Sequence, residues 1–333
     1  MKTLIIAEAG VNHNGDINLA KKLIDIAKEC GADLVKFQLY DSNNLATKDA
    51  AKANYQVLVT DSSESQREML SRLELTEDMM KELILYAKVK GIDIFATGFD
   101  IKSVNTLINF GQERLKIPSG EITNLPLLRH VGRLNKQILI STGMCELNEI
   151  AYAIEILISS GTPKDKITLL HCTSAYPAPM IDINLNAMQA MQKMFDISIG
   201  YSDHSLGNEV AIAAVALGAS VIEKHFTIDR DLPGPDHKAS LEPSELKSMI
   251  SSIRNIEVAM GNGIKRVMPS EISNRAASRK SIVTKVSIKK GELFTFENLT
   301  TKRPGTGVSS IKIDEIIGTK SIRDYAADEL IEL

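Results

Sequence analysis

Tryptophan is absent from this chain, and cysteine is scarce, with three residues in 333. Cys30, Cys145 and Cys172 are widely spaced and form no CxxC pair, so the sequence predicts neither a disulfide framework nor a cysteine-based zinc site. No apolar run approaches the roughly 18 residues of a membrane span, and no cleavage-site pattern follows the N-terminus. The chain also has no large excess of one charge, because it contains 39 Lys and Arg and 42 Asp and Glu, which gives a net charge of -3. These absences argue against a nucleic-acid surface and favour a cytoplasmic protein that acts on a small molecule.

Eight short apolar runs, each typical of a buried β-strand, end at polar side chains and not at an ordinary turn. The runs are TLIIAEAG, DLVKFQ, IDIFATGFD, RLKIPSGE, QILIST, ITLLHCTSAY, ISIGYSDH and SVIEKHF. Between them lie segments with apolar residues at helical spacing, such as Leu19, Leu23, Ile24 and Ala27. This alternation predicts an α/β fold, a (β/α)8 TIM barrel with its active site at the carboxyl ends of the strands. A doubly wound open sheet is the alternative, but it would gather functional groups at one switch point.

The length of the chain leaves room for a second, smaller domain after the barrel. We expect the barrel at residues 1–262, a linker at 263–280, and a small domain of short strands and turns at 281–333. Because a domain of this size has only a small hydrophobic core, we expect it to dock on its own barrel or on a partner subunit. A polar stretch between Asp41 and Leu75 is longer than a structural βα loop usually runs, and we expect it to fold over the barrel mouth.

Lys36 and Lys116 each lie inside an apolar strand, and burying an ammonium group without a partner is costly. Two such lysines at one barrel mouth imply a bound anion, for which phosphate is the natural candidate. Each lysine could instead pair with a carboxylate, Glu8 or Glu121, as an ordinary core ion pair. Hydroxyl groups at neighbouring strand ends would complete the donors that a phosphate needs, and they favour the anion site. These hydroxyls belong to Ser119, Ser141 and Ser202.

His204 and His225 end the last two predicted strands, and neighbouring strands lie about 4.8 Å apart, so the two imidazoles could share one divalent metal ion. Two histidines would leave coordination positions open, as in a catalytic site. His171 and His237 compete for this role, and the sequence does not rank the candidates. His13 is expected to hold a loop.

Three carboxylates complete the inventory of groups that could transfer protons. Asp236 lies in the long loop after the eighth strand, where it could also stabilise a turn, and Glu8 and Glu121 lie at strand ends. The spacing does not decide which of them acts. A metal-independent aldolase remains an alternative, because Lys36 or Lys116 could form a Schiff base with a keto substrate. A non-catalytic carbohydrate-binding role is a weaker one, since it has no use for buried lysines.

Several segments, in this order and spacing, resemble the sialic acid synthases, which condense phosphoenolpyruvate with an N-acetylated mannose-type sugar. They are AEAGVNHNG, VKFQ, KIPSGEITNLP, STGM, LLHCTSAYPAP, GYSDHS, EKHFT and GPDHKAS. The resemblance extends to the C-terminal end, where RKSIV, IKKGE and TTKRPGTG look like the antifreeze-like SAF module of those enzymes.

The resemblance implies roles for individual residues. Around phosphoenolpyruvate it places Lys36, Thr97, Lys116, Ser119, Ser141, Ser174 and Ser202. It implies that the acceptor sugar is bound by Gln38, Glu121, Tyr176 and Asp236. It also implies a domain-swapped homodimer, in which Arg303 of the other subunit contacts the N-acetyl group of the sugar. It implies that His204 and His225 bind a divalent metal ion, typically manganese, with magnesium or cobalt as alternatives. The catalytic set is then Glu8, Lys36, Lys116, Glu121 and Asp236, with Glu8 at the reacting centre.

The resemblance leaves the acceptor sugar open. Departures from the family pattern occur at Gly98, where relatives often carry proline, and at Ser174 and Ala175. N-acetylmannosamine would give N-acetylneuraminate, and 2,4-diacetamido-2,4,6-trideoxymannose would give N,N'-diacetyllegionaminate. The segments AEAGVNHNGD, KFQLY and ANYQ are closer to the legionaminate branch, and the loop from Asp41 to Gln66 is expected to decide between the sugars.

Overall fold

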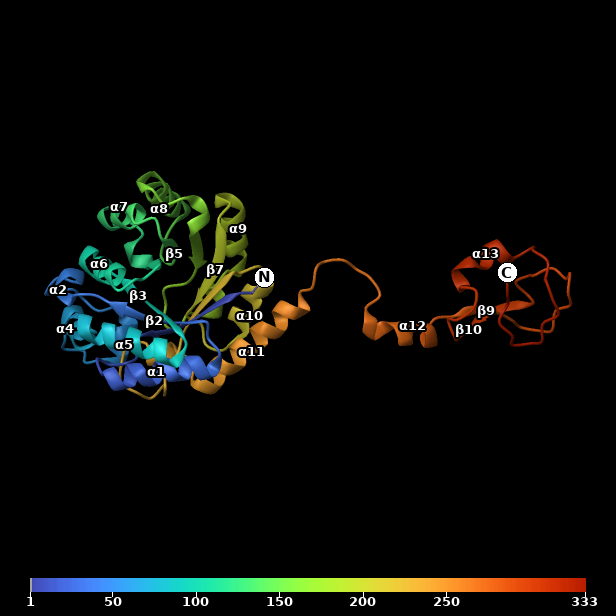
Figure 1. Ribbon diagram of the computed structural model, residues 1–333, viewed down its shortest axis with the longest axis horizontal. Helices are drawn as coiled ribbons and strands as arrows, with labels where there is room; N and C mark the ends of the chain where they lie inside the picture. Colours follow the sequence, from blue (N-terminus) through green and yellow to red (C-terminus); the bar gives the residue numbers. More distant parts are fainter. Residues whose placement is uncertain (1) are drawn as a thin grey trace. The chain divides into compact units, whose positions relative to one another are not determined.

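The computed structural model describes residues 2–333 and separates the chain into two compact units (Figure 1). The first unit ends at Gly261, and the second runs from Asn262 to Leu333. The segment that we expected to be a linker, residues 263–280, falls within the second unit and contains helix α12 (Ile272–Ser278).

Eight parallel strands form the centre of the first unit. They are β1 (Leu4–Gly10), β2 (Leu34–Leu39), β3 (Asp93–Gly98), β4 (Arg114–Ile117), β5 (Gln137–Ser141), β6 (Ile167–His171), β7 (Ser198–Asp203) and β8 (Val221–His225). The hydrogen-bonded order is β3-β2-β1-β8-β7-β6-β5-β4, so β1 pairs with both β2 and β8. The two end strands, β3 and β4, lie next to each other, and the sheet is a nearly closed barrel. The predicted TIM barrel is confirmed, and the open-sheet alternative is wrong.

Helices cover the outside of the barrel (Figure 1). They are α1 (Ile17–Cys30), α5 (Glu77–Lys90), α6 (Ile101–Asn109), α7 (Leu125–Arg133), α8 (Leu147–Ser160), α9 (Leu185–Phe195), α10 (Glu209–Ala216) and α11 (Pro243–Ala259). Helix α1 shows how the sequence sets their ends: the Asp16 side chain accepts a hydrogen bond from the Asn18 amide, and Gly31 closes the helix with a left-handed backbone, φ 87°. The apolar positions Leu23, Ile24 and Ala27 are buried against the strands, as their spacing predicts.

A layer of apolar side chains fills the inside of the barrel below its carboxyl end. Its buried members are Ile6, Leu34, Phe95, Leu139, Leu170 and Val221. Side chains alternate along a strand, so residues two positions further on face the same interior. For Ile6, Leu34 and Val221 these residues are Glu8, Lys36 and Glu223. The apolar layer therefore forms a floor, and polar groups stand on it.

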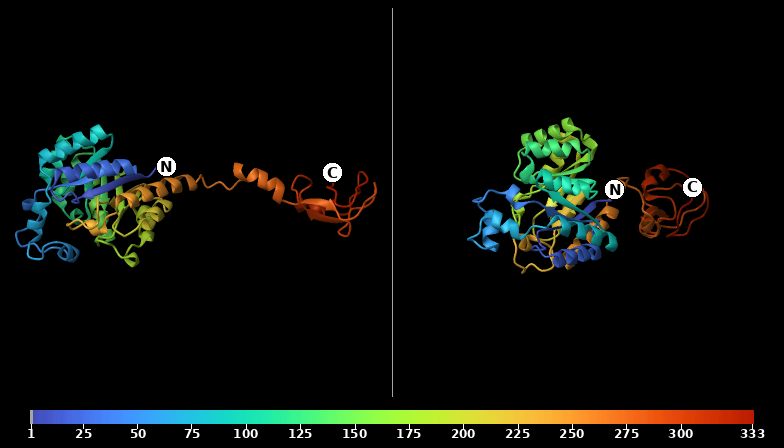
Figure 2. Two further views of the ribbon diagram at one scale, coloured as in Figure 1. Left: turned by 90° about the horizontal axis from the view of Figure 1, so that it is seen from below. Right: turned by 60° about the vertical axis from the view of Figure 1, so that its left-hand side comes forward.

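Residues 41–75, called the lid below, connect β2 to the helix before β3. They contain three short helices, α2 (Ser42–Leu45), α3 (Asn54–Val59) and α4 (Gln66–Arg72). Figure 2 shows this segment, in blue to light blue, at the end of the strands and not along the helical wall. The polar stretch is thus more regular than the loop that the sequence predicts.

The second unit has a small core of its own. Strand β9 (Ser281–Thr284) pairs antiparallel with β10 (Leu299–Lys302), and a short helix, α13 (Ile313–Ile316), follows. The core is built from Ile282, Ile288, Phe294, Leu299, Ile316, Tyr325 and Ile331. Short strands and turns were predicted here, and the structure shows them.

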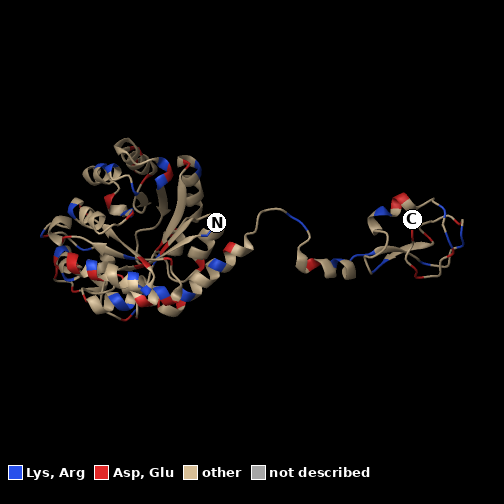
Figure 3. Ribbon diagram, in the orientation of Figure 1, with Lys and Arg blue, Asp and Glu red and all other residues tan. Residues whose placement is uncertain are grey.

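Charged side chains of both signs are interspersed over the helices of the first unit, without a face of one sign in the view of Figure 3. This agrees with the near balance of acidic and basic residues in the sequence. Within residues 2–333, none of the helices has both the length and the apolar character that crossing a membrane requires.

Candidate active site

A cavity of about 420 Å³ opens at the carboxyl ends of the strands. Of the candidates that the sequence analysis placed on the barrel, all except the competing histidines His171 and His237 line it. These residues are Glu8, Lys36, Gln38, Thr97, Lys116, Ser119, Glu121, Ser141, Ser174, Tyr176, Ser202, His204, His225 and Asp236. Arg303 lies in the second unit, just after β10. The structure thus brings the barrel candidates together in one cavity.

The strand register places three of these groups side by side. Glu8 on β1 lies opposite Lys36 on β2 and opposite His225 on β8. Gly10 shows how closely the groups converge, because a β-carbon there would lie 3.2 Å from Glu8 Oε1, 3.3 Å from His225 Cε1 and 3.4 Å from Asp236 Oδ2. A side chain at Gly10 would therefore intrude among them.

Two lysines and two glutamates form a buried ion network inside the barrel. Lys36 Nζ lies 2.5 Å from Glu8 Oε2 and 3.6 Å from Glu223 Oε2, and it donates to Thr97 Oγ1 at 3.2 Å. Lys116 Nζ donates to both oxygens of Glu223, at 2.8 and 2.9 Å. All four side chains are at most 6% exposed, so each ion pair interacts through the protein interior rather than through water.

This network corrects the argument that the lysines lack partners, because both are paired within the protein. The alternative considered for Lys36, a core ion pair with Glu8, is what the structure shows. For Lys116 neither of the two carboxylates considered, Glu8 or Glu121, is the partner, and the partner is Glu223. The two charges of each sign balance, so an anion that enters must compete with the carboxylates for the lysines.

Burial and pairing shift the pKa values of the two glutamates in opposite directions. Burial raises the pKa of Glu8 to about 7, against the opposing effect of Lys36. Burial also acts to raise the pKa of Glu223, but Lys116 and Lys36 outweigh it and hold that pKa well below its ordinary value. Glu223 is therefore a fixed anion, and Glu8 can exchange a proton near neutral pH.

Glu223 is the residue that the sequence analysis missed. Its strand, VIEKH, carries three ionisable residues in a row, and only the histidine among them was considered as a site residue. The alternation of side chains could have identified it, because Glu223 and His225 face the barrel interior together. Lys224, between them, faces the other way and pairs at 2.8 Å with Asp203, and both of these side chains are fully buried.

Hydroxyl groups surround the ion network. Ser202 Oγ donates to Glu223 Oε1 at 3.0 Å, and Ser119 Oγ accepts from the Gly143 amide at 2.9 Å. Ser141 and Thr97 are buried, and Ser174 lies beside Ser119 at Gly143. The structure thus brings these hydroxyl groups into the same cavity as the two ammonium groups.

The two histidines at the ends of β7 and β8 have the state that a metal ligand needs. His204 Nδ1 lies 2.7 Å from the Thr173 carbonyl oxygen, so it carries the proton and leaves Nε2 with a free lone pair. His225 Nδ1 is buried without a hydrogen-bond partner. Burial lowers the pKa of His204 to about 4 and that of His225 well below its ordinary value, so both rings are neutral at pH 7. Their ring centroids are 5.6 Å apart.

Across residues 2–333, the structure shows no cluster of three or more His, Cys, Asp or Glu side chains arranged to hold a metal ion. A metal at His204 and His225 would therefore have these two protein ligands and open positions for other ligands. The neutral pair and the unpaired nitrogen of His225 fit such a group.

The competing histidines are engaged elsewhere. His171 Nε2 lies 2.8 Å from the Ile183 carbonyl oxygen, and His237 Nδ1 lies 2.7 Å from Thr227 Oγ1. His13 accepts a hydrogen bond from the Gly15 amide, so its expected role in a loop is confirmed.

The remaining polar candidates also line the cavity. Asp236 Oδ2 lies 3.8 Å from His225 Nδ1, and burial raises the pKa of Asp236 to about 6. Glu121 accepts from Asn124 Nδ2 at 2.5 Å. Gln38 lies next to Thr97 in the register of β2 and β3. Tyr176 stacks on His204, with ring centroids 4.1 Å apart.

The lid forms part of the cavity wall, so the expectation that it folds over the mouth is confirmed. Its residues in the wall are Leu45, Ala53, Tyr55, Gln56, Gln66, Met69, Leu70 and Leu73. Most of these side chains are apolar, in contrast to the charged groups on the barrel floor.

Comparison with known proteins gives matches along the whole chain. Residues 23–265 match the model of the NeuB family, and residues 279–332 match that of the SAF domain. The chain is 53% identical over 330 residues to the N,N'-diacetyllegionaminic acid synthase of Campylobacter jejuni, covering 99% of each chain. It is 47% identical to the enzyme of the same name from Legionella pneumophila, covering 98% of this chain and 92% of that one. Among solved structures, the N-acetylneuraminic acid synthetase of Leptospira borgpetersenii, in complex with citrate, is 36% identical with a TM-score of 0.73, covering 82% of this chain and 90% of that one.

The raised pKa of Glu8 predicts a pH-dependent stability difference between the wild type and Glu8→Gln. Between the ordinary value of 4.5 and about 7, the folded protein binds the Glu8 proton more tightly than the unfolded chain does. The free energy of unfolding of the wild type therefore falls as the pH rises through this window. Glutamine does not titrate, so Glu8→Gln lacks this contribution. Relative to Glu8→Gln, the wild type should lose about 3 kcal/mol between pH 4.5 and 8. Urea denaturation at a series of pH values measures this, and a difference that stays constant would contradict the raised pKa.

Proposed function

Because the chain belongs to the NeuB family, we propose that it is a transferase that condenses phosphoenolpyruvate with 2,4-diacetamido-2,4,6-trideoxymannose. Its product would be N,N'-diacetyllegionaminate, with release of phosphate. The observation that carries this proposal is 53% identity, over nearly the full length of both chains, to a synthase of that product. The cavity supports it by supplying cationic, hydroxyl, carboxyl and imidazole groups in one place.

We propose that the donor binds at the ion network. Phosphoenolpyruvate carries a carboxylate and a phosphate, and Lys36 and Lys116 are already held in place to receive them. The donor would lie among Thr97, Ser119, Ser141, Ser174 and Ser202. Its negative charge raises the cost of keeping Glu8 ionised, and Glu8 can respond by taking up a proton because its pKa is about 7. The lysine that pairs with Glu8 is then released for the anion.

We propose that His204 and His225 hold a divalent cation, with manganese as the first candidate and magnesium or cobalt as others. When bound, such an ion would polarise the aldehyde oxygen of the open-chain sugar. The neutral state of both imidazoles supports this assignment.

The bond changes follow from the two substrates. C3 of phosphoenolpyruvate forms a bond to the aldehyde carbon, water adds at C2, and the bond between C2 and the phosphate oxygen breaks to leave a 2-keto acid. The aldehyde oxygen gains one proton. The water loses two, one as it adds at C2 and one as the C2 carbonyl forms, and the second is taken up by the leaving phosphate. Glu8 has a pKa matched to the first two transfers, giving a proton in its neutral form and accepting one in its ionised form. Lys36 and Lys116 stabilise the charge on the leaving phosphate.

We assign the acceptor sugar to Gln38, Glu121, Tyr176 and Asp236, which line the same cavity. The second candidate acceptor is N-acetylmannosamine, because a solved relative is an N-acetylneuraminic acid synthetase. A Schiff base at Lys36 is disfavoured, since Glu223 and Glu8 outweigh burial, raise the pKa of Lys36 and keep its amine protonated. Burial lowers the pKa of Lys116, so an aldolase would have to use that lysine.

We also propose a domain-swapped homodimer in which Arg303 of the SAF unit reaches the sugar's N-acetyl group in the other subunit. The Arg303 side chain is exposed, held by one hydrogen bond from Nε to the Ser278 carbonyl oxygen at 3.1 Å, and so is available to a ligand. In Arg303→Ala the apparent KM for the sugar should rise far more than that for phosphoenolpyruvate, and equal effects would contradict the assignment.

A cytoplasmic location completes the proposal. Cys30, Cys145 and Cys172 are unpaired, and phosphoenolpyruvate is an intracellular metabolite. Fractionation of cells that express the protein would contradict this if the chain were recovered outside the cytoplasm.

A product assay tests the function directly. The protein is incubated with phosphoenolpyruvate, manganese and either 2,4-diacetamido-2,4,6-trideoxymannose or N-acetylmannosamine, and the nine-carbon keto acid is identified by mass spectrometry. We expect the first sugar to have the higher kcat/KM. Phosphate release that does not depend on any sugar would contradict a synthase, and preference for N-acetylmannosamine would move the protein to the other branch.

Replacing His225 with alanine tests the metal ligands. We expect Mn²⁺ binding, measured by calorimetry on the free protein, to weaken by about 100-fold or more, because one of only two protein ligands is lost. Thermal unfolding serves as the control for an intact fold. Unchanged Mn²⁺ affinity would place the ion elsewhere.

A further inference from the structure

A column of three stacked rings joins the lid to the proposed metal ligand. Tyr55 on α3 packs against Tyr176 with ring centroids 4.9 Å apart and an interplanar angle of 31°, and Tyr176 packs against His204 at 4.1 Å and 32°. Tyr55 and Tyr176 both line the cavity. A displacement of α3 would therefore move the outer ring away from the place where a sugar meets the imidazole.

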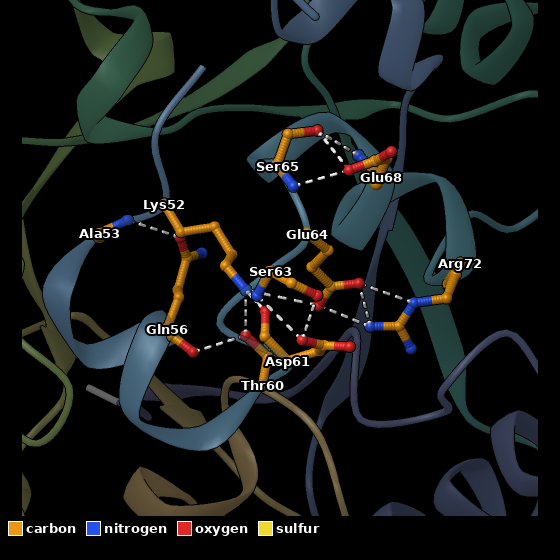
Figure 4. A network of polar contacts seen from close by, with 10 residues as sticks. All are labelled: Lys52, Ala53, Gln56, Thr60, Asp61, Ser63, Glu64, Ser65, Glu68 and Arg72. Carbon is orange, nitrogen blue, oxygen red and sulfur yellow. Dashed lines mark hydrogen bonds and ion pairs between the residues drawn. The ribbon is translucent and has the colours of Figure 1, made fainter. Parts of the chain in front are cut away.

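A buried lysine fixes α3 in this position. Lys52 lies two residues before the first residue of the helix, and its side chain is 2% exposed. Its Nζ donates to Thr60 Oγ1 at 2.8 Å and to the Asp61 carbonyl oxygen, both just after the helix, and lies 3.5 Å from Glu64 Oε1 (Figure 4). One ammonium group thus ties the start of α3 to its end.

The contacts around Lys52 extend to the next helix. Glu64 also receives two hydrogen bonds from Arg72 Nη2, at 2.8 and 2.7 Å, and one from Nε at 3.1 Å (Figure 4). The Gln66 amide donates to the Ala50 carbonyl oxygen at 2.9 Å. The lid is thereby closed on itself around Lys52, Glu64 and Arg72, which we call the clasp.

The need for the clasp follows from the composition of the lid. Helix α3 buries no residue completely, and six residues are too few to be stable as an isolated helix. Only Met69 and Leu73 of the lid are buried in the apolar cluster beneath it, with Val11 and Tyr40. An ammonium group taken out of water is costly unless its donors are satisfied, so the Lys52 contacts hold one geometry of the segment.

We propose that Tyr55 contacts the acceptor sugar and selects it, and that Lys52 is the positioning residue that holds Tyr55 in place. This inference rests on the proposed function and assigns acceptor recognition to the lid. The acceptor class that fits is a deoxy sugar with a methyl group and acylated amines, because most of the side chains that the lid contributes to the cavity wall are apolar. Leu45, Met69 and Leu70 are among them, and Gln56 and Gln66 are the polar members. Burying a methyl group against the apolar side chains costs less than burying a hydroxymethyl group there.

Kinetics of Lys52→Met test the positioning role. Methionine replaces the buried stem, and Glu64 keeps its pairing with Arg72, so no carboxylate is left without a partner. We expect the KM for 2,4-diacetamido-2,4,6-trideoxymannose to rise about 10-fold, with kcat and the KM for phosphoenolpyruvate changed by less than about 2-fold, as for a loss of binding common to ground and transition states. The matched control is Lys48→Met, an exposed lysine of the same lid, which should match the wild type.

A second variant, Tyr55→Leu, leaves the clasp intact and removes the outer ring. We expect the ratio of kcat/KM for the diacetamido sugar to that for N-acetylmannosamine to fall about 10-fold, because the ring no longer selects between them. Thermal unfolding of each variant separates loss of fold from loss of sugar recognition. If Lys52→Met is unstable, the Tyr55→Leu result still tests whether the lid selects the acceptor sugar.

The outcomes separate this inference from the proposed function. A wild-type protein that makes no product from either sugar overturns the proposed function. An active wild type with unchanged acceptor KM in Lys52→Met, or with an equal rise in the KM for phosphoenolpyruvate, overturns the positioning role of Lys52. An unchanged acceptor ratio in Tyr55→Leu overturns the selection by Tyr55.

Discussion

The constraint on which the site depends is the mutual neutralisation of Lys36, Lys116, Glu8 and Glu223 inside the barrel. Removing Lys36, Lys116 or Glu223 would leave an uncompensated charge in a place with little water, a situation that typically costs several kcal/mol. Such pairs are a weak source of stability, since apolar side chains would fill the same space at no electrostatic cost. Their presence is better explained by function: they hold two cations in position while no substrate anion is bound.

The barrel makes this arrangement possible in two ways. Its apolar floor of Ile6, Leu34, Phe95, Leu139, Leu170 and Val221 closes the interior below the charges. The parallel register then sets Glu8 beside both Lys36 and His225, so the anion site and the proposed metal site share a boundary. In the proposed reaction, the donor anion and the aldehyde would meet over Glu8, the group whose pKa lies near neutral pH.

Much of this could be predicted from the sequence, because strand ends are local features. Each polar side chain that follows an apolar run is a candidate for the carboxyl rim of a barrel, and those candidates do line one cavity. The partners of the lysines could not be predicted, because Lys116 and Glu223 are 107 residues apart and meet only across the closed barrel. The alternation of side chains along a strand could have predicted that Glu223 faces the barrel interior, but its ionisable neighbours Lys224 and His225 made the pattern hard to recognise.

The lid marks another limit of prediction. Helices of four to seven residues are too short to show a sustained apolar period, so the segment reads as a polar loop. What orders it is the clasp around Lys52, a set of contacts between residues that are each unremarkable in sequence.

A crystal structure of the protein with phosphoenolpyruvate and Mn²⁺ tests the central claim most directly. The account predicts that the donor's phosphate and carboxylate oxygens lie within hydrogen-bond distance of Lys36 and Lys116, with the ion on His204 and His225. A donor bound elsewhere, with both lysines still paired only to Glu8 and Glu223, would contradict it.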